Sequence, residues 1–220
     1  EKSYKDSLIA MRDYFMIPMK EAATVSNNWY GLTQKDVSQL FQNTNEIIKL
    51  SELVLSKFQE SLAGSGEVAR VFLDIGPRLH IYSTYTTGLN DAQSLFSQLK
   101  KNQNFVQFLE NCQDKSKRTL DLSAYLIMPV QRLPRYLILL DTLQKHTDKD
   151  GEGYAAIKEA YTHLEELVRT INEEKRTIER TLRMKQLLQE VTPKCAQTLS
   201  SGNREFLEET VLSGKHTLIH

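Results

Sequence analysis

The stretch from Leu120 to His146 constrains the fold more than any other part of the chain. Apolar residues recur in it at spacings of three and four, which places them along one side of an α-helix. The predicted buried stripe consists of Leu122, Tyr125, Leu126, Val130, Leu133, Tyr136, Leu137, Leu140 and Leu143. Such a stripe is typical of an amphipathic helix that packs against other elements. The sequence therefore predicts one long helix with this side against a core.

The opposite side of the same predicted helix differs from an ordinary solvated face. It carries two isoleucines, a proline, an alanine, an amide and one guanidinium: Ala124, Ile127, Gln131, Pro134, Arg135 and Ile138. A face left to water would hold Lys, Glu and Asp instead. Exposed apolar groups around a few polar ones are typical of a surface that binds another protein. The alternative is a kinked core helix in an ordinary bundle, because periodicity alone fits both.

Two prolines, Pro129 and Pro134, lie inside this pattern. Each lacks an amide donor and crowds the carbonyl group four residues earlier, which costs about 3 kcal/mol or more in an uninterrupted helix. The apolar pattern nevertheless continues in phase across both prolines. We therefore expect one helix that is bent or locally loosened at these positions.

The rest of the chain predicts an all-α fold. Nine glycines and five prolines are few for 220 residues, and helical periodicity extends over residues 2–23, 43–59, 68–101 and 154–191. Thr33, with Asp36 three residues later, predicts a helix start of the capping-box type. Gly76-Pro77 predicts a kink, residues 62–66 predict a break between helices, and residues 114–118 predict a charged loop.

Composition excludes several classes of function. The 28 basic and 28 acidic residues leave no positive excess for nucleic acid. No apolar run is long enough to span a membrane, and no signal peptide is recognisable. Cys112 and Cys195 lack metal-ligand spacing, which predicts a reducing compartment and no structural metal. Without a nucleophile–base pair or a phosphate-binding loop, we expect no covalent chemistry, no catalytic residue and no cofactor.

A family resemblance rests on the same organising stretch. Its residues 129–136, Pro-Val-Gln-Arg-Leu-Pro-Arg-Tyr, with Leu-Ile-Leu-Leu after them and Lys-His-Thr at 145–147, resemble the third conserved region of Dbl-homology domains. Those domains are exchange factors for Rho-family GTPases. Glu1, followed three residues later by Tyr4, is similar to their first conserved region, and residues 71–95 resemble their second. The resemblance covers about residues 1–190 and implies an elongated multi-helix bundle.

The resemblance also implies a set of contacts with a GTPase. Glu1 would hold switch I, and Asn172 on the last long helix would hydrogen-bond switch II. Gln131 and Arg135 would hold the switch region and its flanking strands. Apolar contact around them would come from Ala124, Ile127, Pro134 and Ile138. From the residues alone, Glu1 is equally an acidic group favoured by a helix dipole, and Asn172 is equally a solvated side chain.

The function implied by the resemblance is guanine nucleotide exchange on a Rho-family GTPase. Isoleucine at position 127 goes in the family with Rac-type partners, so a Rac-like GTPase is favoured. Met128 stands where many members carry a basic residue, but its position on the helical wheel lies off the predicted partner-binding side of the helix. The implied location is the cytoplasm, with recruitment to a membrane or the actin cytoskeleton. The alternative is a helical scaffold that binds a partner without exchange activity.

Two domains are expected. Residues 1–192 would form the Dbl-homology domain, which ends before Pro193. Residues 193–220 would form a linker and a short β fragment, since they look like the opening strands of a pleckstrin-homology domain. A complete domain of that kind would add a membrane phosphoinositide as a partner, but these residues are too few to make one.

Overall fold

Helices account for most of the chain that a computed structural model describes, which is residues 1–25, 29–61, 65–116 and 120–190. In chain order they are α1 (Lys2–Met11), α2 (Ile17–Ala22), α3 (Gln34–Phe41), α4 (Thr44–Glu60), α5 (Ser65–Ile75), α6 (Ile81–Leu99), α7 (Gln103–Ser116), α8 (Leu122–Lys145) and α9 (Glu152–Glu190). A π-helical segment, η1 (Arg12–Met16), joins α1 to α2, and a 3₁₀ segment, η2 (Gly76–His80), joins α5 to α6. No strand occurs within these ranges, and the all-α prediction is confirmed. The expected β fragment and its domain boundary fall outside the described residues.

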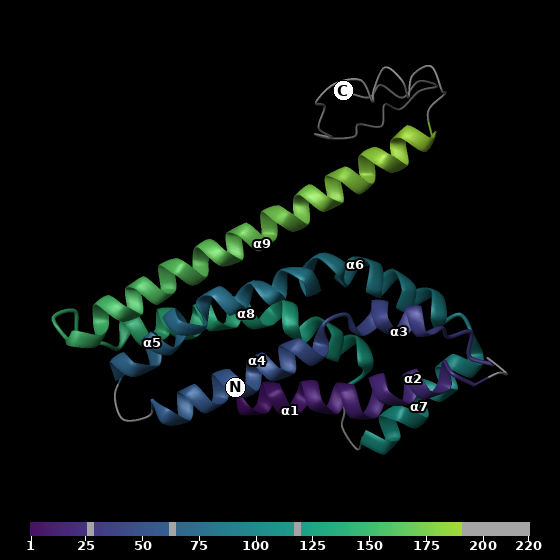
Figure 1. Ribbon diagram of the computed structural model, residues 1–220, viewed down its shortest axis with the longest axis horizontal. Coiled ribbons are helices and arrows are strands. Elements are labelled where there is room, and N and C mark those ends of the chain that lie inside the picture. Colours follow the sequence, from purple (N-terminus) through teal and green to yellow (C-terminus); the bar gives the residue numbers. More distant parts are fainter. Residues whose placement is uncertain (26–28, 62–64, 117–119, 191–220) are drawn as a thin grey trace. The chain divides into compact units, whose positions relative to one another are not determined.

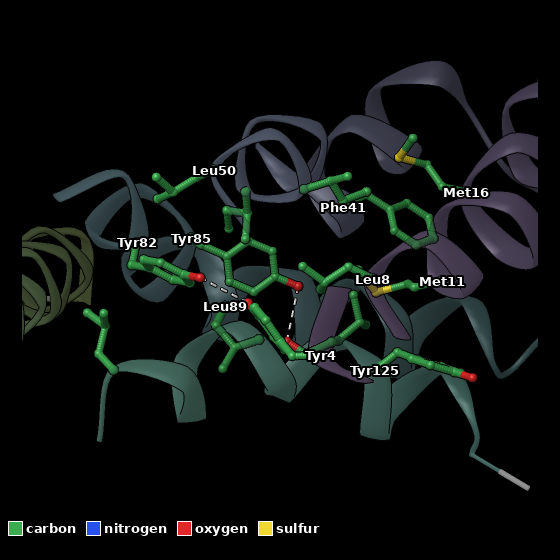
Figure 2. Close-up of a cluster of buried hydrophobic side chains, with 14 of the residues drawn as sticks. Tyr4, Leu8, Met11, Met16, Phe41, Leu50, Tyr82, Tyr85, Leu89 and Tyr125 are labelled. Carbon is green, nitrogen blue, oxygen red and sulfur yellow. Dashed lines mark hydrogen bonds between the residues drawn. The ribbon is translucent and has the colours of Figure 1, made fainter. Parts of the chain in front are cut away.

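The chain divides into two compact units, Glu1–Ile171 and Asn172–His220. In the first unit, α6 contacts both α3 and α8, while α1 contacts α4 and α8 (Figure 1). Its core contains many fully buried aromatic rings, among them Tyr82, Tyr85, Tyr125, Tyr136, Phe15, Phe41 and Phe105. Figure 2 shows Tyr4 of α1 reaching Tyr82 of α6, with 3.2 Å between the two hydroxyl oxygens. Phe72, Tyr82 and Tyr85 are all buried in this core.

The organising helix predicted over residues 120–146 is α8. Asp121 caps its start, because its Oδ1 accepts a hydrogen bond from the amide of Ala124 at 2.8 Å. The predicted stripe packs inward: Leu122, Tyr125, Leu126, Leu133, Tyr136 and Leu140 are buried, and Val130, Leu137 and Leu143 are half-buried against the core. Both prolines lie inside the helix, which remains continuous across them.

Several predicted boundaries hold, and three need correction. The Thr33–Asp36 capping box is present, and the chain turns through η2 at Gly76-Pro77. The predicted break at residues 62–66 is too long, since α5 begins at Ser65. Gly66 lies in the first turn of α5, outside the helix interior in which glycine is most unfavourable. The predicted charged loop also starts too early. Helix α7 continues to Ser116, which is buried one turn after buried Cys112.

The third correction concerns the first predicted helix, residues 2–23. Its period is interrupted by η1, where the amide of Ile17 reaches back to the carbonyl of Arg12. Pro18 follows directly, and a proline ring clashes with the carbonyl four residues earlier in a regular helix. A widened turn before Pro18 relieves that clash. The segment therefore remains helical but changes its hydrogen-bonding pattern.

Candidate functional site

The outward side of α8 presents the six residues singled out by the sequence. We call Ala124, Ile127, Gln131, Pro134, Arg135 and Ile138 the docking face. Gln131, Pro134 and Arg135 are exposed, Ala124 and Ile127 are half-buried, and Ile138 is 65% exposed. Leu139, which is 54% exposed and one turn after Arg135, extends the apolar part of this surface. The sequence analysis missed Leu139, although its spacing from Arg135 indicates it.

A hollow of about 190 Å³ lies beside the docking face. Its walls are formed by the start of α1 and by α8: Glu1, Ser3, Tyr4, Ser7, Met128, Gln131, Arg132 and Arg135. We call it the Glu1 hollow. It brings Glu1 together with Gln131 and Arg135, three residues that the sequence proposed as parts of one site. Met128, one turn before Arg132 on α8, also lines the hollow, while its assignment to a position off the docking face stays a prediction.

The carboxylate of Glu1 points into the protein instead of capping its helix. Glu1 is the N-cap residue of α1, yet its side chain makes no capping hydrogen bond. One carboxylate oxygen, Oε2, accepts from the Tyr136 hydroxyl at 2.6 Å and also pairs with Nη2 of Arg132. The other, Oε1, accepts from the Ser51 hydroxyl. The side chain is only 3% exposed, so stabilisation by a helix dipole alone does not describe Glu1.

Arg132 is the buried cationic partner of Glu1. Its guanidinium lies between two aromatic rings, 4.5 Å from the centroid of Tyr4 and 4.4 Å from that of Tyr136. Cations over aromatic faces gain electrostatic attraction that grows as water is removed. Burial alone would lower the pKa of the Arg132 guanidinium, but its neighbours Tyr136 and Glu1 outweigh burial and raise it. Arg132 therefore stays charged.

Tyr136 completes this arrangement. Burial raises the pKa of its phenol well above the ordinary value, so the hydroxyl remains a hydrogen-bond donor. Neither Ser51 nor Arg132 is among the residues predicted from the sequence, and Tyr136 is predicted only as part of the buried stripe. A signal for Arg132 was present, since it falls in helical phase with buried Tyr125 and Tyr136. A charged residue on a buried stripe indicates a buried ion pair.

Asn172 is exposed on α9 and begins the second unit of the chain. Exposure leaves its amide available to a partner. Its assignment to switch II stays a prediction.

Within the described part of the chain, no group of three or more His, Cys, Asp or Glu side chains is placed to hold a metal ion. No helix in these ranges has the length and apolarity needed to cross a membrane. Burial raises the pKa of the Cys112 thiol to about 11, which keeps it protonated and unreactive near neutral pH.

Comparison with known proteins identifies the family of the chain. The model of the RhoGEF domain matches residues 1–172. The chain belongs to the RhoGEF domain family. The resemblance to Dbl-homology domains is thereby confirmed.

Curated relatives of this RhoGEF domain are much longer proteins. It is 29% identical over 211 residues to Rac guanine nucleotide exchange factor JJ of Dictyostelium discoideum. That alignment covers 96% of this chain and 18% of the relative. It is 31% identical over 184 residues to the Myosin-M heavy chain of the same organism, covering 81% and 10%. It is 29% identical over 190 residues to the human guanine nucleotide exchange factor VAV3, covering 84% and 21%. The chain thus spans about a fifth or less of these relatives.

Solved structures share the fold. A structure of the Vav1 exchange factor with its PH and C1 domains superposes with a TM-score of 0.74 at 24% identity, over 90% of this chain and 53% of that one. The DH/PH domains of PDZ-RhoGEF, solved in complex with activated RhoA, give a TM-score of 0.76 at 18% identity, over 95% of this chain and 63% of that one. At these identities the likeness supports the all-α fold.

Proposed function

We propose that this RhoGEF domain is a guanine nucleotide exchange factor that binds both switches of a Rho-family GTPase. The observation that carries the proposal is the continuity of one surface. The exposed docking face of α8 borders the hollow that contains Glu1, with Gln131 and Arg135 belonging to both. Exposed apolar side chains around a few fixed polar groups are what a protein partner needs for a desolvated contact.

Exchange requires binding energy and no covalent chemistry. A GTPase that holds nucleotide at picomolar affinity gains about 16 kcal/mol from it. A protein that binds the nucleotide-free conformation tightly weakens nucleotide binding by the same factor, because linkage is reciprocal. The domain therefore has to hold the switches in a shape that no longer fits Mg²⁺ and phosphate. A rigid helical face is suited to this task.

Each residue of the site has a defined part in the proposal. Glu1 meets switch I at the hollow, where a carboxylate with about four acceptor positions has one to spare beyond its three internal donors. Gln131 and Arg135 hold the switch region and its flanking strands. Asn172 hydrogen-bonds switch II. Ala124, Ile127, Pro134 and Ile138 exclude water around these polar contacts.

A Rac-type GTPase is the proposed partner. Ile127 presents a β-branched side chain, which is stiff at χ1 and offers a fixed surface. Among the curated relatives, one is named as a Rac guanine nucleotide exchange factor and another as a Rac exchanger. The joint presence of Glu1, Arg135 and Asn172 favours exchange over a scaffold role, since a scaffold has no need of all three.

The test is release of a fluorescent GDP analogue from a panel of Rac-, Rho- and Cdc42-type GTPases. We expect release to accelerate in proportion to the concentration of the domain, with the largest effect on a Rac-type member. A tight complex with the nucleotide-free GTPase is expected as well. Binding without any acceleration would establish the scaffold alternative instead, and neither binding nor acceleration across the panel would refute the proposal.

A further inference from the structure

We propose that Arg132, Tyr136 and Ser51 are positioning residues that hold the Glu1 carboxylate in the orientation required for exchange. This inference rests on the proposed function, because it concerns how Glu1 meets the GTPase. The three side chains come from two helices, α4 and α8, and converge on a residue at the start of α1. We call them the Glu1 cage.

The geometry of the cage fixes both carboxylate oxygens. Tyr136 and Arg132 bind Oε2, and Ser51 binds Oε1, so the carboxylate cannot rotate without breaking a hydrogen bond. Arg132 is in turn held between the rings of Tyr4 and Tyr136. All donors are buried or nearly so, with Arg132 7% and Tyr136 1% exposed. None of the three is therefore available as a large contact surface for a partner.

The consequence for exchange follows from the location of Glu1. Glu1 is the N-cap residue of α1, and helix ends fray more readily than helix interiors. A carboxylate on a mobile segment would pay ordering entropy each time it met a partner. The cage removes that cost by ordering Glu1 in advance. It also connects Glu1 directly to α8, because Arg132 adjoins Gln131 in the chain and lies within one turn of Arg135.

The decisive variant is Tyr136→Phe, which deletes one hydroxyl and keeps the ring beside Arg132. Its matched control is Tyr82→Phe. That change deletes an equally buried hydroxyl, whose hydrogen-bond partner is the hydroxyl of Tyr4 and not the carboxylate of Glu1. We expect Tyr136→Phe to lower kcat/KM for GDP release about tenfold or more, the size expected when a hydrogen bond to a charged group is lost. We expect Tyr82→Phe to leave kcat/KM within about twofold of the parent.

A double-mutant cycle separates positioning from simple loss of structure. In a Glu1→Ala background there is no carboxylate to orient, so adding Tyr136→Phe should lower exchange no further. A purely structural role would reduce exchange by the same factor in both backgrounds. Arg132→Lys provides a second variant, since lysine keeps the charge but cannot stack as a plane between two rings. We expect it to lose exchange like Tyr136→Phe, and again only when Glu1 is present.

Failure of the positioning role and failure of the proposed function give different outcomes. Equal kcat/KM for Tyr136→Phe and Tyr82→Phe, or full additivity with Glu1→Ala, would overturn the positioning role while leaving the parent domain active on the panel. Failure of the parent domain itself on every GTPase would instead refute the proposed function. Far-ultraviolet circular dichroism and thermal unfolding of each variant confirm that the helices are intact before rates are compared.

Discussion

The side chain of Gln42 occupies the space in which Gly88 would carry a Cβ atom. An ideal Cβ at Gly88 would lie 2.8 Å from Cδ of Gln42. Gln42 itself ends α3 with φ at 46°, in the left-handed region that non-glycine residues rarely adopt. The two residues join the α3–α4 turn to the middle of α6, where a glycine is otherwise unfavourable.

Gly88→Ala should therefore lower the stability of the bundle. Overpacking of this kind costs about 1–3 kcal/mol, and the better helix propensity of alanine returns only about 0.5–1 kcal/mol. We expect a net loss near 1 kcal/mol in the free energy of urea unfolding. In a Gln42→Gly background the obstruction is gone, so the same change should become stabilising. An equal cost in both backgrounds would show that Gln42 is not the obstacle.

Alkaline pH should destabilise the fold through its buried tyrosines. Burial raises the pKa of Tyr4, Tyr82, Tyr85 and Tyr136 above the ordinary 10.0. The unfolded chain releases these protons near pH 10 while the folded chain keeps them. Their contribution to stability is therefore complete below pH 10 and is lost as pH rises further, by about 1.4 kcal/mol per pH unit for each tyrosine.

The measurement is urea unfolding between pH 7 and about pH 11.5, together with tyrosinate absorbance. The phenols of Tyr4, Tyr82, Tyr85 and Tyr136 should ionise only as the helical signal disappears. If all nine tyrosines ionised near pH 10 with the helices intact, burial would not control their pKa values.

The features of the fold that could be predicted from the sequence are those set by local residue spacing. The two sides of α8 follow from spacing alone, since positions three and four apart share a side. The predicted stripe residues between Leu122 and Leu140 lie inward as expected. The capping box at Thr33 is equally local. Within α8, the spacing of Arg132 from Tyr125 and Tyr136 also predicts that it lies on the buried side. The spacing does not identify Glu1 as its partner.

Contacts between distant segments could not be foretold in the same way. The three donors to Glu1 are 50, 131 and 135 residues away along the chain, and no local pattern states which helices approach one another. The side chain of Gln42 fills space left free by Gly88, which is another long-range partner. The widened turn of η1 arises from the ring of Pro18, a local cause that periodicity does not reveal.

Asn172→Ala should remove most exchange activity without unfolding the helix. Asn172 is exposed on α9, where alanine is the better helix former by up to about 0.7 kcal/mol. Loss of a switch II contact at an interface hot spot would cost about 2 kcal/mol or more in kcat/KM. The control is Asn111→Ala, which changes an exposed asparagine on α7 and should leave the rate of GDP release unchanged. Parallel loss of helical signal and activity would instead assign Asn172 a structural role.

Arg135→Glu should weaken the complex with the nucleotide-free GTPase. Arg135 is exposed on the docking face, and reversing a charge opposite a complementary surface costs a few kcal/mol. The loss should shrink as salt is raised, because exposed charges are screened. Arg78→Glu on η2 makes the same change at another exposed arginine and serves as the matched control. Dissociation constants from titration calorimetry, unchanged for Arg135→Glu, would remove it from the interface.

Ile127→Leu should shift the choice of GTPase. Ile127 is half-buried on the docking face, so part of its side chain is accessible to a partner. Isoleucine is broad at Cβ, whereas leucine branches one carbon later and suits a smaller facing aromatic ring. A difference of this size is worth about 1–3 kcal/mol, enough to change the ratio of kcat/KM for Rac-type over other partners tenfold. Leu137→Ile, the reverse isomeric change on the inward side of α8, is the control for general repacking. Equal ratios on Rac-type and Rho-type substrates for the parent and Ile127→Leu would show that another residue selects the partner.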